Sequence, residues 1–134
     1  MHWKRVSDFV TRMPNRPGAL AGLAARLREA DVPVLGMWGP VHGRHTMGFH
    51  CIPESAEQFR NFCRDSELDA FEQPAFLLSD PAKGGGLVAA LDAIAHAGIN
   101  IEGIQCIALD GSLAAILWVD HADEPRLQIG RAHV

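Results

Sequence analysis

A short polar corner, Asn15-Arg16-Pro17-Gly18-Ala19-Leu20, carries the residue types in this chain that are best suited to hold a small anionic group. Pro17 fixes φ and lacks an N–H group, which suits the entry of a helix, and Gly18 lets the backbone pass close to another group. Asn15 can cap the corner or offer its amide to a ligand. Because the first N–H groups of a helix have no partner within it, they favour a carboxylate or a phosphate.

Three histidines, His42, His45 and His50, are the candidates for a metal site. His42 and His45 fall in a predicted turn, whereas His50 lies in a predicted strand next to Cys51, and neighbouring strand residues point to opposite faces. This spacing does not bring three or four ligands together. We therefore predict no metal site, and no other pattern in the chain calls for a cofactor.

The remaining reactive side chains form no catalytic arrangement. Cys51, Cys63 and Cys106 are predicted to be buried side chains of apolar character rather than nucleophiles. Three aspartates stand at predicted turns and form no carboxylate pair for acid–base catalysis: Asp80, Asp110 and Asp120. Tyrosine is absent, which removes one common catalytic acid. We predict that the protein is not an enzyme.

Composition restricts the class of protein further. The 134 residues suffice for one domain or two small ones, and 48% hydrophobic with 21% charged residues is ordinary for a globular chain. A net charge of -4 argues against binding nucleic acid. No apolar run approaches the length of a membrane span, and no signal peptide is visible. Three scattered cysteines without a CxxC pattern fit reduced thiols, so we expect a cytoplasmic protein without a membrane partner.

Apolar periodicity predicts the elements that position the corner. A strand precedes it and an amphipathic helix follows it, and the helix ends before Pro33. Gly36, Gly39 and Pro40 interrupt the next strand, which indicates an edge, a bulge or a bend. Ser55 with Gln58 resembles a capping box at the start of a second helix. The predicted strands and first helix are Val6–Met13, Ala19–Ala30, Val32–Val41, Thr46–Ile52 and the short Glu67–Phe71.

A second cycle of the same kind begins near Gln73. Gly98 is a natural helix stop, and Asp110-Gly111 is a strong hairpin-turn signal. The last strand is apolar almost throughout and is predicted to be central. The predicted elements are the strand Pro74–Leu78, a corner at Asp80–Gly86, the helix Leu87–Ala97 and the strands Ile99–Leu109 and Ser112–Val119.

The two cycles align without a gap at an offset of 67 residues, which is the step from Gly18 to Gly85. At this offset Gly36 meets Gly103, and Val32-Pro33-Val34 meets Ile99-Asn100-Ile101. Such an internal repeat predicts an α+β fold of two tandem ferredoxin-like βαββαβ units with antiparallel sheets. We place the first module at residues 1–72 and the second, incomplete module at 73–128.

The C-terminal residues 129–134 show no periodicity. Because Ile-Gly-Arg-Ala-His-Val matches one reading frame of a common sequencing adapter, we expect this tail to be non-native and the second module to be truncated; an ordinary disordered tail is the alternative. A second unit without its last helix and strand should be less stable and should leave part of an apolar sheet face uncovered.

The repeated motif resembles the ACT domain family, whose ferredoxin-like modules bind small molecules, usually amino acids, and regulate metabolic enzymes. The corner Asn15–Leu20 and the segment from Gly85 to Ile101 match the family's Pro-Gly, Leu-rich helix and Gly-hydrophobic-Asn-Ile pattern. The resemblance covers residues 5–127 and is similar to small two-module members of the family.

The resemblance also implies which residues bind a ligand. Serine-binding members use an Asn in the corner of one module and an Asn in the strand after the helix of the other. Here Asn15 matches the first and Asn100 the second, whereas the reciprocal positions are Ala82 and Pro33. We therefore predict one composite site and one degenerate site. The predicted ligand-binding residues are Asn15, Arg16, Pro17, Gly18, Ala19, Leu20, Lys83, Gly85, Asn100 and Ile101.

Simpler interpretations exist for several of these residues. Asn15 can cap a turn, Asn100 can bond to backbone at a strand end, and Lys83 can be solvated. The glycines Gly84, Gly85 and Gly86 lack the spacing of a nucleotide-binding loop and more simply give a flexible helix entry.

Two functions follow from the sequence. The first is a non-catalytic regulatory module that binds a small amino acid or related metabolite between two ACT-like modules and responds by a shift in their arrangement. The second is an interaction module without a small ligand, which pairs through its sheet edges with itself, as a homodimer, or with an enzyme of amino-acid metabolism.

Overall fold

The computed structural model describes residues 2–41, 46–81 and 85–125. The predictions for His42, His45, Ala82 and Lys83, and for the tail at residues 129–134, concern residues outside these ranges.

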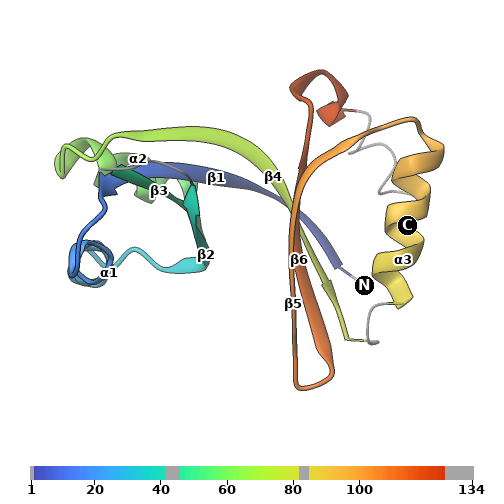
Figure 1. The fold of residues 1–134 in the computed structure, drawn as a ribbon, viewed down its shortest axis with the longest axis horizontal. Coiled ribbons are helices and arrows are strands. Elements are labelled where there is room, and N and C mark those ends of the chain that lie inside the picture. Colours follow the sequence, from blue (N-terminus) through green and yellow to red (C-terminus); the bar gives the residue numbers. More distant parts are fainter. Residues whose placement is uncertain (1, 42–45, 82–84, 126–134) are drawn as a thin grey trace. The chain divides into compact units, whose positions relative to one another are not determined.

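The strands and helices of the described chain follow the order expected for two βαββαβ-like sets (Figure 1). The elements are β1 (His2–Pro14), α1 (Ala19–Glu29), β2 (Val34–Val41), β3 (Thr46–Pro53), α2 (Ala56–Asp65), β4 (Ala70–Asp80), α3 (Gly85–His96), β5 (Ile101–Leu109), β6 (Ser112–Val119) and the 3-10 turn η1 (His121–Asp123). The α+β class predicted from the sequence is confirmed.

The six strands form one antiparallel sheet with the strand order β2-β3-β1-β4-β6-β5. β6 lies between β4 and β5, which confirms its predicted central place. β2 lies at an edge, and its pairing with β3 shifts register between Val34 and Gly36 and again between Trp38 and Val41. The breakers in its sequence therefore mark an irregular edge strand, as predicted.

The prediction of two separate strands around residue 72 is wrong, because β4 is one continuous strand from Ala70 to Asp80. Pro74 does not interrupt it. The residues of β4 that pair with β6 begin at Phe76, so the missing N–H group of Pro74 removes no hydrogen bond from that pairing. The short strand predicted from Glu67 to Phe71 begins too early, because Glu67 lies in a turn and has a left-handed φ of 53°.

The chain divides into two compact units. The first unit comprises Ser7–Gln73, and the second combines the N-terminal residues up to Val6 with the chain from Pro74 onward. β1 and β4 each contribute residues to both units. The module boundary predicted after residue 72 falls inside β4 and stays a prediction.

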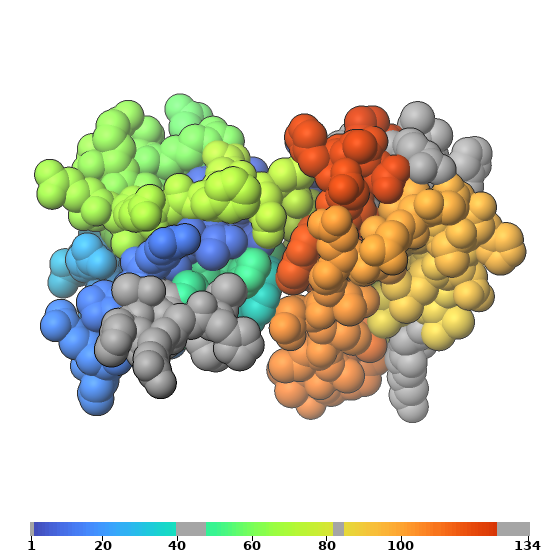
Figure 2. All heavy atoms as spheres, turned by 45° about the horizontal axis from the view of Figure 1, so that its top comes forward, coloured from blue at the N-terminus to red at the C-terminus, as the bar shows by residue number. Residues whose placement is uncertain are grey.

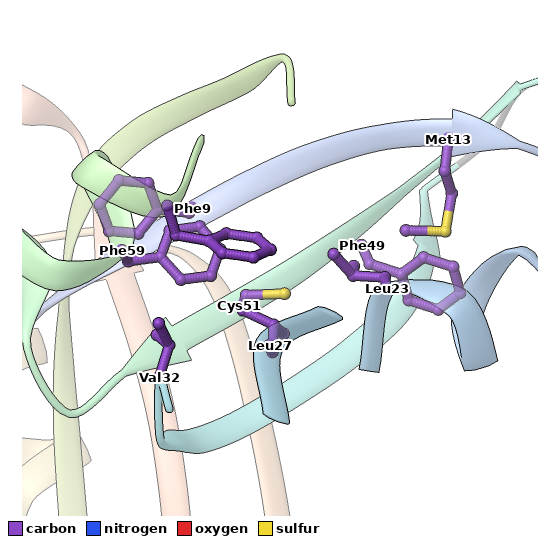
Figure 3. Packing of buried hydrophobic residues seen from close by; sticks show 9 residues of the cluster. Phe9, Met13, Leu23, Leu27, Val32, Phe49, Cys51 and Phe59 are labelled. Carbon is purple, nitrogen blue, oxygen red and sulfur yellow. The ribbon is translucent and has the colours of Figure 1, made fainter. Parts of the chain in front are cut away.

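Helices α1 and α2 bury the first unit's apolar cluster against its strands (Figure 3). The rings of Phe9 in β1 and Phe59 in α2 lie 4.5 Å apart. α1 contributes Leu23 and Leu27, which are one turn apart and therefore on one face. Ser55 caps α2 by accepting a hydrogen bond from the N–H group of Gln58 at 3.3 Å, in line with half of the predicted capping box.

The second unit has a smaller core around Phe76, Ile94, Ile99 and Leu117. Trp3, in the N-terminal part of β1, packs against this cluster in a T-shaped arrangement with Phe76. In a βαββαβ unit the last strand lies beside the first, and here the N-terminal part of β1 takes this place beside β4. The strand that the sequence suggested was missing is therefore supplied from the start of the chain.

The turns predicted from glycine in the second unit are confirmed. Gly98 ends α3 with a left-handed φ of 74°. At the β5–β6 hairpin, Asp110 and Gly111 both have positive φ, at 52° and 80°, as a two-residue hairpin of this hand requires.

Candidate ligand-binding corners

The first corner connects β1 to α1 and is open to solvent. Asn15, Arg16, Pro17 and Gly18 are all exposed. Ala19 and Leu20 are half-buried and pack against the first unit's apolar cluster, so their side chains are structural. What the helix start can offer a ligand is its backbone N–H groups, because the first turn of a helix has no acceptors within the helix.

Gly18 is the residue before α1 and has a left-handed φ of 87°. A Cβ atom placed there would meet no atom within 4 Å. Packing against the protein therefore does not require glycine here, whereas the backbone conformation favours it. Close approach of a ligand to Gly18 stays a prediction.

Among the described residues, no side chain caps α1. Asn15 is thus not a helix cap, and its exposed amide is available to a ligand. Within the corner, the Arg16 N–H group donates to the Pro14 carbonyl at 3.0 Å and the Gly22 N–H group donates to the Gly18 carbonyl at 2.9 Å. The N–H group of Ala19, the first residue of α1, donates to the Arg16 carbonyl at 3.3 Å. These bonds hold the corner in shape, and in the first turn of α1 the N–H groups of Leu20 and Ala21 stay open within the described part of the chain. Such a helix start attracts a carboxylate.

The second corner, between β4 and α3, is organised differently. Asp80, at the end of β4, is 3% exposed, and its Oδ2 accepts a hydrogen bond from the Gly86 N–H group at 2.8 Å. The start of α3 therefore already holds a carboxylate that belongs to the chain itself. Gly85, predicted to contact a ligand, is the exposed first residue of α3.

The predicted strand residues of the site lie just before and at the start of β5. Asn100 is exposed, whereas Ile101 is half-buried against the second unit's core. At the equivalent place in the first unit, Pro33 is exposed and its carbonyl accepts a hydrogen bond from the Glu54 N–H group at 3.0 Å. The structure thus brings Asn15 to Leu20 together in one corner, and it places Asn100 and Ile101 together in the other unit.

Sequence reasoning missed a buried polar cluster on β1, β3 and β4. Asp8 is fully buried, and its Oδ2 lies 2.6 Å from His50 Nδ1 and accepts a hydrogen bond from Gln73 at 2.9 Å. Trp38 stacks flat on the His50 ring at 4.6 Å between centroids. The available signal was Asp8 itself, an acid placed directly before the apolar pair Phe9 and Val10 in a predicted strand.

His50 is therefore engaged in a polar pair with Asp8. Within residues 2–41, 46–81 and 85–125, no three His, Cys, Asp or Glu side chains are grouped as a metal ion would require. Nor is any helix in these ranges long and apolar enough to cross a membrane.

The cysteines differ in burial, and the prediction that all three are buried is wrong for Cys106, which is exposed on β5. β5 is an edge strand, and its residues from Gln105 to Leu109 are all exposed. Burial, reinforced by the negative charge of Asp8, raises the pKa of Cys51 to about 12, and burial raises that of Cys63 to about 11. Both thiols therefore stay neutral and poorly reactive.

No protein-family profile and no curated protein sequence matches this chain. Solved structures do match. Protein BT0572 from Bacteroides thetaiotaomicron is similar over 97% of this chain and 90% of its own length, with a TM-score of 0.79 and 12% sequence identity. The ligand-free regulatory subunit of aspartate kinase from Thermus thermophilus is similar over 99% and 97%, with a TM-score of 0.66 and 11% identity.

The chain has a tandem ACT fold. The resemblance seen in the sequence motifs is thereby confirmed. Escherichia coli aspartokinase III, solved in complex with lysine and aspartate, is similar over 98% of this chain and 32% of its own length. The TM-score is 0.54 and the sequence identity is 14%. Identities this low establish the fold alone, so the tandem ACT fold positions the two corners without assigning a ligand to either.

Proposed function

We propose that this protein is a non-catalytic regulatory module that binds a small amino acid or a related metabolite. The ligand's carboxylate is held by the open N–H groups at the start of α1, and its polar groups are bound by Asn15 and by Asn100 with Ile101. Arg16 adds a positive charge to the first corner. A cytoplasmic location and regulation of an enzyme of amino-acid metabolism belong to this proposal.

The observation that carries the proposal is the open first corner. It combines an exposed Asn15 amide, a left-handed Gly18 and a helix start that no described side chain caps. An α-amino acid offers the matching groups, because its carboxylate accepts from N–H donors and its ammonium donates to an amide oxygen. The fold is shared with a regulatory subunit of aspartate kinase, and aspartokinase III was solved with lysine and aspartate.

Binding would regulate by linkage. A ligand that touches residues of both units favours one of their arrangements, by no more than the difference between its affinities for the two. A partner enzyme that reads this arrangement would then respond to the concentration of the amino acid.

A thermal-shift screen with the twenty amino acids tests the proposal, starting with lysine and aspartate. A ligand specific to the folded state stabilises it by about 2.7 kcal/mol at a hundredfold excess over its dissociation constant. For the amino acid that raises the midpoint most, calorimetry on Asn15→Ala and Asn100→Ala should show at least a tenfold weaker affinity in each variant.

Asn61→Ala is the matched control, because Asn61 is an exposed asparagine on α2, away from both corners. Its affinity should equal that of the unaltered protein. If no amino acid shifts the midpoint, or if Asn15→Ala and Asn100→Ala bind as tightly as Asn61→Ala, the proposed site is wrong.

A second candidate function, pairing with another copy through a sheet edge, is favoured by β5. Of the two edge strands of the described sheet, β2 is irregular, whereas β5 pairs with β6 without a shift from Gly103 to Leu109. Its side chains Ile104, Ile107 and Leu109 are 41%, 69% and 71% exposed, and Figure 2 shows this segment, in orange, at the surface. The one charged residue of β5, Glu102, lies before this regular segment, and a regular edge without charges pairs readily with another strand.

Sedimentation as a function of protein concentration separates the two functions. A dimer through β5 predicts that Ile107→Lys shifts the protein to the monomer. Val88→Lys, at a 61% exposed apolar residue of α3, should leave the dimer intact. A protein that stays monomeric at every concentration would argue against this second function.

A further inference from the structure

The corner of the second unit contains a contact that the corner of the first unit lacks. We propose that Asp80 is a built-in carboxylate ligand of the second corner, which closes that corner to carboxylates from solution. Each chain then has one corner that binds a ligand carboxylate, the one at Asn15–Leu20. This number rests on the function proposed above.

The Asp80 contact is more than a local helix cap. Asp80 is the last residue of β4, and the N–H group that its Oδ2 accepts from belongs to Gly86, six residues later and inside α3. A carboxylate that is 3% exposed is costly to bury unless strong donors satisfy it. A first-turn N–H group at the positive end of a helix is such a donor.

The internal repeat shows why the first corner is open. At the offset that aligns Gly18 with Gly85, Gly86 aligns with Ala19 and Asp80 aligns with Met13. Met13 is buried in the first unit's apolar cluster, and its thioether carries no negative charge. The Ala19 N–H group donates instead to the neutral Arg16 carbonyl, at 3.3 Å. The end of β1 therefore brings no anion to the start of α1, whereas the end of β4 brings one to the start of α3.

The charge of Asp80 also opposes a second anion. Two carboxylates that share one set of donors repel each other, and the repulsion is strong where water is excluded. A ligand carboxylate would have to displace the buried Asp80 carboxylate from the Gly86 N–H group. One buried side chain thus removes the second binding site that a symmetric repeat would provide.

Chemical rescue with formate, the smallest carboxylate, tests the proposal. Loss of such a contact in Asp80→Ala should lower the thermal midpoint by about 4–8 °C. Formate should raise the midpoint of Asp80→Ala above its value in chloride of equal ionic strength, and it should leave the unaltered protein unchanged. In a titration followed by amide NMR, the Gly86 resonance should move with formate in Asp80→Ala only.

Asp80→Asn is the matched control. Its amide oxygen still accepts from Gly86 and fills the same volume, so formate should move neither its midpoint nor its Gly86 resonance. If Asp80→Ala does not fold, Asp80→Ser provides a smaller acceptor that leaves room for formate, and the same titration applies.

Formate that leaves the Gly86 resonance of the folded Ala or Ser variant unmoved would overturn the proposal, as would an equal response in the unaltered protein. This result is independent of amino-acid binding at the first corner, which the Asn15 and Asn100 variants report. Failure of one proposal is therefore distinguishable from failure of the other.

Discussion

Gly36 and Gly103 occupy the same position in the two repeats, but the structure requires glycine at only one of them. A Cβ atom at Gly36 would meet nothing within 4 Å. A Cβ atom at Gly103 would lie 2.0 Å from the indole ring of Trp118, which crosses the backbone of β5 at this point. An alignment gives both glycines equal weight, whereas their neighbours give them different roles.

This difference predicts opposite outcomes for two matched substitutions. Gly103→Ala should lower the free energy of unfolding by about 1–3 kcal/mol, because a rigid ring must move to admit the methyl group. Gly36→Ala should change it by no more than about 0.5 kcal/mol. Urea unfolding of both variants provides the measurement. Equal losses at the two positions would contradict the role assigned to Trp118.

The buried thiol of Cys51 predicts how stability depends on alkaline pH. Its pKa in the folded protein is raised to about 12 by burial and by Asp8, so folding favours the neutral thiol. The stabilisation is complete below the pKa of a thiol in the unfolded chain, about 8.5, and is lost as the pH rises toward the folded value. Urea unfolding from neutral pH to about pH 11 should show this decline.

Two variants assign the decline to its source. Cys51→Ala should remove most of the slope, and Cys63→Ala a smaller part, since the pKa of Cys63 is raised less. The chain has no tyrosine whose titration would obscure the result. A slope that persists unchanged in Cys51→Ala would show that another group is responsible.

At the scale of the elements, the Asp8 cluster joins three strands of the first unit. Asp8 lies on β1, His50 on β3 and Gln73 on β4, and both contacts converge on one carboxylate oxygen. The other oxygen, Oδ1, is buried without a hydrogen-bond partner among the described residues. The cluster is therefore sensitive to the loss of any member.

His50→Ala should cost about 3–5 kcal/mol, because it leaves a buried carboxylate without its main partner. The double variant Asp8→Ala with His50→Ala should recover part of this loss, since the uncompensated charge is then gone. Guanidinium unfolding measures both, with His96→Ala on the exposed end of α3 as the control. A double variant that loses the full sum of the single losses would show that the pair is not coupled.

The sequence predicted most elements correctly where local chemistry determines them. Ser55, Gly98 and Asp110-Gly111 act through their own backbone or the next few residues, so their roles are visible in the sequence. The fusion of two predicted strands into β4 was not visible, because it depends on which neighbour pairs with the residues around Pro74.

The candidate site likewise has a part that the sequence predicts and a part that it does not. The corner at Asn15 could be predicted from its turn residues, but the occupied corner at Asp80 could not, because the contact with Gly86 is seen only once the strand end and the helix start are placed. Asp8 and His50 are 42 residues apart and meet only through the pairing of β1 with β3. Contacts of this range are set by tertiary structure rather than by local pattern.

At the scale of the whole chain, the second unit depends on residues from the N-terminus. Trp3 packs on the core that contains Phe76, and Arg5 forms an ion pair with Glu124, which is only 7% exposed. These contacts join the two ends of the described chain within one unit. The described core of the second unit therefore includes Trp3, from the N-terminal part of β1.

Trp3→Ala should therefore destabilise the second unit by about 2–4 kcal/mol, through the loss of a large, partly buried ring. Hydrogen exchange should show faster exchange in β4, β6 and α3, while the first unit's β3 keeps its protection. His2→Ala, at an exposed neighbour, is the control. Equal loss of protection in both units would show that the chain opens as a single cooperative whole.

The place of the first six residues in the second unit also bears on biosynthesis. On the ribosome, Trp3 leaves the exit tunnel long before Phe76 and Leu117, and it packs against the cluster that these two residues form. The first unit can fold while translation continues, because Ser7–Gln73 contains all of its strands and helices. The N-terminal part of β1 must wait for β6 to be made, so the second unit is expected to form later than the first.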